Sequence, residues 1–137
     1  MTDEVDFDSL VHAIMQQESG GRNLVSRDPN SGKPIAYGPM QITPDTWRTY
    51  AKGNENINDP ETNKAVGKRI LAHLGELTNW DAHKMAQGYF AGPGGIGKDR
   101  KDALGQGTHK YADEVMHRLG SKREAAGMQP ATFHVRH

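Results

Sequence analysis

The chain has 137 residues, of which 34% are hydrophobic, so it fits one domain with a substantial core and is too short for two. Its 17 basic and 17 acidic residues balance, which leaves no overall positive field to attract nucleic acid or an anionic membrane. Cysteine is absent, so disulfides and thiolate metal ligands are excluded, and no segment approaches the roughly 20 apolar residues of a membrane span.

The first predicted helix begins after Asp6, a suitable N-cap, and ends where Gly20 and Gly21 stop it. Its apolar residues recur at helical spacing: Phe7, Leu10, Val11, Ile14 and Met15. Glu18 follows Ile14 by four residues and therefore falls on the same stripe. Burial and the negative end of the helix dipole both favour a protonated carboxyl there, which is what glycosidic bond cleavage requires of its proton donor. In the alternative, the register slips by one residue and Glu18 points into water.

Glycine, asparagine, serine and two prolines are concentrated in residues 19–37, which predicts a long loop. We expect this loop to form one wall of a cleft. Thr43, with Pro44 and Asp45 behind it, opens a short helix that ends near position 51. Asp59 opens a longer helix that runs to about position 77. The buried stripe predicted for that helix consists of Val66, Ile70, Leu74 and Leu77.

A fourth helix is predicted over residues 82–89, ended by the glycines and proline of residues 92–95. Thr108 is a suitable cap for the last helix, which ends near Leu119. Strand-like alternation is hard to find, so we expect a mainly α fold. The domain is expected to cover residues 1–119, and the basic, aperiodic residues 120–137 are expected to form a solvated or disordered tail.

Four ordered motifs carry a family resemblance. They are Glu-Ser-Gly-Gly at 18–21, Ala-Tyr-Gly-Pro-Met-Gln-Ile at 36–42, Gln-Gly-Tyr-Phe-Ala-Gly-Pro-Gly at 87–94 and Thr-His-Lys-Tyr-Ala at 108–112. Over roughly residues 7–119 the chain resembles the soluble lytic transglycosylase (SLT-type) domain family. The resemblance implies a lysozyme-like fold with a groove for the glycan strands of peptidoglycan. It also implies cleavage of the β-1,4 bond between N-acetylmuramic acid and N-acetylglucosamine, with formation of a 1,6-anhydro sugar.

The family mechanism needs one carboxyl group, no metal and no organic cofactor. Glu18 would protonate the bridging oxygen while the N-acetyl group of the muramyl residue stabilises the cationic centre. As a carboxylate it would then take the proton from the 6-hydroxyl of the same sugar, which closes onto the anomeric carbon. Because this nucleophile is tethered, it outcompetes water when the site is dry.

Motif matching also suggests which residues contact substrate: Ser26, Tyr37, Met40, Gln41, Tyr89, Phe90 and Tyr111. Gln41 and Tyr89 match positions that hydrogen-bond substrate or catalytic groups in relatives, although a loop amide and core packing are the respective alternatives. Phe90 stands where the family usually has asparagine. Matching Ser26 requires a gap, and Met40 is expected to line the wall of the site.

Three other functions are open at this stage. A lysozyme-type hydrolase would use Asp28, Asp45 or Asp59 to activate water opposite Glu18. A peptidoglycan-binding module without turnover would keep the groove alone. A zinc hydrolase is the weakest alternative, because no His-Glu-x-x-His helix exists.

The acidic first eight residues lack the basic start and apolar run of a secretory signal. Because peptidoglycan lies in the periplasm or cell wall, we expect delivery by a phage virion or through a holin-permeabilised membrane, or membership of a larger protein. Expected partners are glycan strands alone, with no nucleic acid and no membrane insertion, and we expect a monomer.

Overall fold

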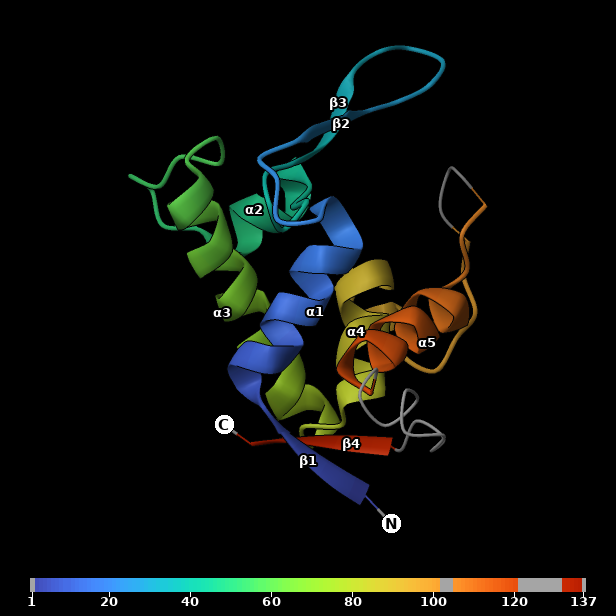
Figure 1. Cartoon of the computed structure of the whole chain (residues 1–137). Coiled ribbons are helices and arrows are strands. Elements are labelled where there is room, and N and C mark those ends of the chain that lie inside the picture. The colour runs from blue at the N-terminus through green and yellow to red at the C-terminus, as the bar shows by residue number, and fades with distance from the viewer. Residues whose placement is uncertain (1, 102–104, 121–131, 137) are drawn as a thin grey trace. The chain divides into compact units, whose positions relative to one another are not determined.

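The computed structural model describes residues 2–101, 105–120 and 132–136 (Figure 1). The chain divides into two compact units. One consists of Ile14–Ile70, and the other of Met1–Ala13 with Leu71–His137. We call them the central unit and the terminal unit, and each is described by itself.

Helices dominate the described residues, which confirms the predicted mainly α fold. The helices are α1 (Phe7–Ser19), α2 (Pro44–Tyr50), α3 (Pro60–Thr78), α4 (Ala82–Ala91) and α5 (Thr108–Leu119), with a 3-10 turn, η1, at Pro93–Gly95. The strands are β1 (Thr2–Asp6), β2 (Val25–Arg27), β3 (Pro34–Tyr37) and β4 (Thr132–Arg136).

Side-chain caps fix where several helices begin. The Asp6 carboxylate accepts a hydrogen bond from the backbone N–H of Ser9 at 2.7 Å, and Thr43 caps α2. Asp59 accepts from the N–H of Thr62 at 3.0 Å. These three caps confirm the predicted starts. The predicted Thr108 cap is wrong, because Gly107 occupies the cap position. Thr108 is buried, and its hydroxyl forms hydrogen bonds with the backbone N–H and carbonyl of Arg100.

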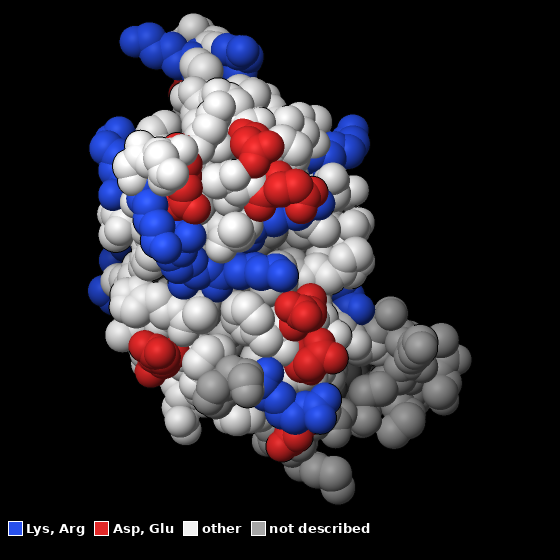
Figure 2. Space-filling view, turned by 90° about the vertical axis from the view of Figure 1, so that its left-hand side faces the viewer, with Lys and Arg blue, Asp and Glu red and all other residues white. Residues whose placement is uncertain are grey.

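In the central unit, the stretch predicted as a loop contains an antiparallel hairpin of β2 and β3. The pairing aligns Val25 with Tyr37, and a bulge interrupts it between Ser26 and Arg27. Asp28 closes the turn by accepting from the backbone N–H groups of the residues two and three positions later. The hairpin extends from the unit, and basic side chains gather at its outer end (Figure 2), where Lys33 is exposed.

In the terminal unit, β1 and β4 form a parallel pair, so the first and the last strand of the chain lie side by side (Figure 1). Phe133 and Val135 of β4 are buried, and the Val135 N–H donates to the Trp80 carbonyl at 2.8 Å. The prediction of a solvated tail is therefore wrong for residues 132–136, while residues 121–131 lie outside the described part. Short strands that pair across the whole chain leave little local signal.

Trp80 is an anchor of the terminal unit. Its indole lies over Gly75, where an added Cβ would come within 2.3 Å of the ring, and it meets Phe7 edge to face at 6.2 Å between centroids. Leu77, predicted to be buried, is 54% exposed because it lies in the last turn of α3, just before the helix ends.

Candidate active site

Glu18 lies in the last turn of α1 and is half-buried. The helix stops directly after Ser19, where Gly20 and Gly21 adopt φ values of 67° and 83°, a region that favours glycine. The alternative register, with Glu18 pointing freely into water, does not fit this burial. The carboxyl group therefore sits at the carbonyl end of a helix, as the spacing predicted.

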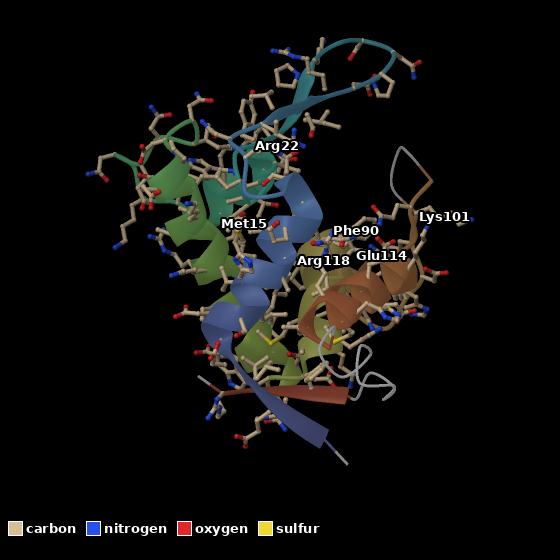
Figure 3. The ribbon with its side chains drawn as sticks, in the orientation of Figure 1. Met15, Arg22, Phe90, Lys101, Glu114 and Arg118 are labelled. Atoms are coloured by element: carbon tan, nitrogen blue, oxygen red, sulfur yellow. The ribbon has the colours of Figure 1, made fainter. Side chains whose placement is uncertain are left out.

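Ser19 fixes the end of α1 and was missed by sequence reasoning. Its side chain is buried, and its hydroxyl donates to the Pro39 carbonyl at 2.8 Å. The same oxygen accepts from the N–H of Gly21 at 3.0 Å. The hydrogen bond from Ser19 to Pro39 thus links the end of α1, next to Glu18, to the second motif. Beyond the helix end, Arg22 folds back so that its Nε donates to the Ser19 carbonyl at 3.0 Å (Figure 3).

The second motif is a tight turn closed on itself. Tyr37 and Ile42 exchange two backbone hydrogen bonds of 3.0 Å, and Gln41 takes a positive φ of 49°. The Gln41 amide nitrogen donates to the Leu24 carbonyl at 3.0 Å and to the Gly38 carbonyl at 2.9 Å, while its oxygen accepts from the Ser26 hydroxyl. Gln41 therefore ties the hairpin to the turn, which agrees with the loop-amide alternative.

Asn63 of α3 forms hydrogen bonds with the backbone of this turn, a role that the sequence did not predict. It is fully buried on α3, and its oxygen accepts from the Met40 N–H at 3.0 Å. Its amide nitrogen donates to the Tyr37 carbonyl at 2.9 Å and to the Ile57 carbonyl at 3.2 Å. A Cβ at Gly38, where φ is 81°, would lie 2.4 Å from this amide, so only glycine fits. A signal was available, because Asn63 precedes Val66 by three positions on the buried stripe.

The predicted contact residues of the central unit differ in burial. Met40 is fully buried beside Gly67, where an added Cβ would come within 2.6 Å of its side chain, so it is part of the core. Ser26 and Tyr37 are half-buried on the hairpin. Ser19, Gln41 and Ser26 therefore belong to one hydrogen-bonded framework built from the end of α1, the turn and the hairpin, and Glu18 directly precedes Ser19.

The other predicted contact residues lie in the terminal unit. Tyr89 and Phe90 are half-buried near the end of α4. Tyr111 of α5 is only 2% exposed, and its ring lies 4.8 Å from that of Phe90 between centroids. Figure 3 labels Phe90 on α4 with Glu114 and Arg118 on α5. Phe90 thus packs on an aromatic neighbour, where an asparagine would offer hydrogen bonds.

The three aspartates considered as water activators all serve local structure. The N–H groups of Ser31 and Asn30 lower the pKa of Asp28, and a hydrogen bond from the Thr62 hydroxyl lowers the pKa of Asp59. Asp45 pairs with Arg48 on the exposed side of α2. A lowered pKa makes a carboxylate a weaker base, so Asp28 and Asp59 are poorly suited to deprotonate water.

Among the described residues there is no group of three or more histidine, aspartate or glutamate side chains arranged to hold a metal ion. Within the same residues, no helix combines the length and apolar character needed to cross a membrane.

The fold and the framework around Glu18 define a mainly helical domain with one half-buried glutamate at a helix end. The transglycosylase SLT domain model matches residues 4–112, a range that contains all four motifs. The chain therefore belongs to the transglycosylase SLT domain family. This confirms the family that the motifs indicated.

A solved structure of lytic transglycosylase Slt from Pseudomonas aeruginosa, an inactive mutant with glutamine in place of a glutamate, is similar to this chain with a TM-score of 0.60 and 21% identity. The likeness covers 90% of this chain and 23% of that one, so the chain spans about a quarter of the relative's length. Together with the family match it confirms the predicted lysozyme-like fold.

Proposed function

We propose that this domain is a peptidoglycan lytic transglycosylase in which Glu18 is the single catalytic acid and base. The observation that carries the proposal is the half-buried Glu18 at the end of α1, with its backbone fastened through Ser19 to the second family motif. The family match and the similarity to lytic transglycosylase Slt support the same reaction class.

The proposed reaction uses one carboxyl group twice, first as an acid and then as a base. Protonated Glu18 gives its proton to the oxygen between N-acetylmuramic acid and N-acetylglucosamine, and the glycosidic bond breaks. The N-acetyl group of the muramyl residue stabilises the positive anomeric carbon. The Glu18 carboxylate then removes the proton of the 6-hydroxyl, whose oxygen bonds to the anomeric carbon. The products are a 1,6-anhydro end and a free 4-hydroxyl, and Glu18 is protonated again.

The state of the three candidate aspartates favours this mechanism over a hydrolysis that uses two carboxylates. Hydrolysis by the usual inverting or retaining route uses a second carboxylate that acts on water or on the sugar. Asp28 closes a turn, Asp59 caps α3 and Asp45 pairs with Arg48, so each is engaged elsewhere. An internal nucleophile needs none of them, because its effective concentration exceeds that of bulk water.

We assign the remaining motif residues two kinds of role. Ser26, Gln41 and Tyr37 shape the site by holding the hairpin and turn beside Glu18, with Met40 packed behind them. Tyr89 and Phe90 contact the glycan, and Tyr111 supports Phe90 through the ring contact. The substrate is the glycan strand of peptidoglycan in the periplasm or cell wall.

The direct test is Glu18→Gln, which keeps the shape of the side chain and removes its proton transfer. The rate of release of soluble fragments from purified peptidoglycan should fall by at least about 100-fold, the usual contribution of a positioned acid or base. Glu76→Gln is the matched control, because Glu76 is exposed on α3. The proposal is wrong if the Glu18 variant, folded as judged by circular dichroism, keeps the activity of the control.

A further inference from the structure

A chain of hydrogen bonds in the terminal unit joins α5, α4 and the loop after α4. The Asp113 carboxylate lies 2.8 Å from His83 Nε2, and His83 Nδ1 lies 2.6 Å from the Gln87 amide nitrogen. The Gln87 amide oxygen accepts from the backbone N–H of Gly97 at 2.7 Å. Gln87 is buried, and His83 lies one turn before it on α4.

The backbone N–H of Gly97 sets the direction of the whole chain. Because this N–H can only donate, the oxygen of Gln87 must face it, and the amide NH₂ group must face His83. An NH₂ group only donates, so Nδ1 of His83 must carry a lone pair. The ring proton is then on Nε2 and points toward Asp113. One protonation state, the neutral ring with its proton on Nε2, satisfies all three hydrogen bonds.

The loop held by Gln87, residues 92–97, begins within the third family motif and extends past its end at position 94. It contains η1 and Ile96 and directly follows Tyr89 and Phe90, the proposed glycan contacts. Ile96 packs over Gly88, since an added Cβ there would lie 3.1 Å from the end of its side chain. The bond from Gly97 to Gln87 and this apolar contact dock the loop onto α4.

We propose that His83 and Gln87 are positioning residues that form a proton-controlled latch on the loop of residues 92–97. A neutral His83 ring orients the Gln87 amide, which holds the loop in its binding-competent arrangement. When Nδ1 gains a proton, two donors face each other. The amide must then rotate and give up the Gly97 N–H, or stay and lose the His83 bond. Either change breaks one hydrogen bond of the buried Gln87 amide and so weakens its hold on the loop.

The charges around His83 decide how the latch responds. α4 packs against α5, η1 and β4. Against the ring lie the Asp113 carboxylate, 2.8 Å from Nε2, and the His109 ring, at 6.5 Å between centroids. Asp113 is largely exposed, so solvent screens its attraction. Among the described residues of α4, the following loop, α5 and β4, the other titratable groups are Lys84, Tyr89, Lys98, Asp99, Arg100, Lys101, Lys110, Tyr111, Glu114, His117, Arg118, His134 and Arg136.

The latch has a consequence that depends on the proposed function: mild acid should weaken glycan binding through the loop. Histidine ordinarily changes its charge between about pH 5 and 8. One pH unit below the midpoint of the His83 titration, about 10% of the rings are neutral, so kcat/KM should be about tenfold below its plateau if only the latched form binds.

Nuclear magnetic resonance of the full, isotope-labelled chain tests the latch without using activity. The backbone amide signal of Gly97 and the ring signals of His83 should titrate with one shared midpoint. Gln87→Glu places a carboxylate that accepts from both Gly97 and a protonated His83. In that variant the Gly97 signal should stay constant, and the His83 midpoint should rise by about 1 pH unit or more. A Gly97 signal that ignores the His83 titration in the unaltered protein would overturn the latch.

Kinetics on purified peptidoglycan then test its effect. Gln87→Glu and His83→Gln should both lose the tenfold acid-side decrease, because neither contains a donor clash that protonation can create at Nδ1. His12→Gln, an exposed change on α1, is the control and should keep the decrease. If Gln87→Glu fails to fold, His83→Gln alone tests the latch. The latch is overturned if kcat/KM of His83→Gln still falls tenfold on the acid side. A Glu18→Gln protein that stays active refutes the proposed function alone, since the resonance result does not depend on turnover.

Discussion

Asn63→Asp is the sharpest perturbation of the framework beneath the candidate active site. The new carboxyl group keeps an oxygen for the Met40 N–H, but its second oxygen faces two carbonyls, those of Tyr37 and Ile57, at the places where the amide nitrogen now lies 2.9 and 3.2 Å away. An ionised carboxylate has no proton to donate to either carbonyl. The folded state therefore favours the protonated acid, and burial acts in the same direction.

The size of the effect follows from linkage. A pKa raised by about 3 units in the folded state, within the range of buried carboxyl groups, corresponds to about 4 kcal/mol. This raised pKa means that the penalty is absent below the unfolded value near pH 4 and grows as pH rises toward 7. One lost hydrogen bond adds about 1 kcal/mol at every pH. At roughly 4 °C per kcal/mol, the melting temperature should fall by about 20 °C at pH 7 and by about 5 °C at pH 3.

Thermal unfolding followed by circular dichroism at both pH values, with the unaltered protein as reference at each, measures this difference. Asn54→Asp is the matched control, because Asn54 is exposed in the loop before α3 and should change the melting temperature by only a few degrees. Asn63→Asp would contradict this account if it lowered the melting temperature equally at pH 3 and pH 7. An equal melting temperature for Asn63→Asp and Asn54→Asp at pH 7 would also contradict it.

Two further predictions concern the two units separately. Hydrogen bonds from Arg69 and from the Lys52 backbone lower the pKa of Glu55 to about 2. A lowered pKa stabilises the fold above the ordinary value of 4.5 and loses that effect as pH falls toward 2. Glu55→Gln should therefore lower the melting temperature at pH 7 and match the unaltered protein near pH 2, and a pH-independent difference would contradict this. Phe133→Ala should lower the free energy of unfolding by about 3 kcal/mol in urea titrations, whereas a solvated tail would give less than about 0.5 kcal/mol.

The helices were predictable because their signals are local. Apolar spacing and the caps at Asp6, Thr43 and Asp59 lie within a few residues of the elements they define, and the structure bears them out. Thr108 looked the same in sequence, but its hydroxyl found a tertiary partner in Arg100. Nothing in the local pattern distinguishes the two outcomes.

The strands were harder to predict because their partners lie elsewhere in the chain. β1 and β4 pair from opposite ends, so neither needs a long alternating pattern to be stable. The hairpin of β2 and β3 did leave a cue, since aspartate, proline, asparagine and glycine at its tip are turn residues. With strands of three and four residues, that cue alone did not establish pairing.

The position of Glu18 followed from spacing, whereas the groups that hold it did not. Ser19 and Asn63 act through backbone groups 20 or more positions away. Their side chains are common in loops and caps, so composition gives no sign of burial. The position of Asn63 on an apolar stripe was the one available signal, because a buried amide there must find several partners.

The measurement that tests the central claim most directly is product analysis of peptidoglycan digested in water enriched in oxygen-18. Mass spectrometry should find 1,6-anhydro muramyl ends that carry no label, because the incoming oxygen is the 6-hydroxyl oxygen of the same sugar and water takes no part in the reaction. Reducing ends that carry one atom of oxygen-18 would contradict the account, since water would then be the nucleophile and the domain a hydrolase.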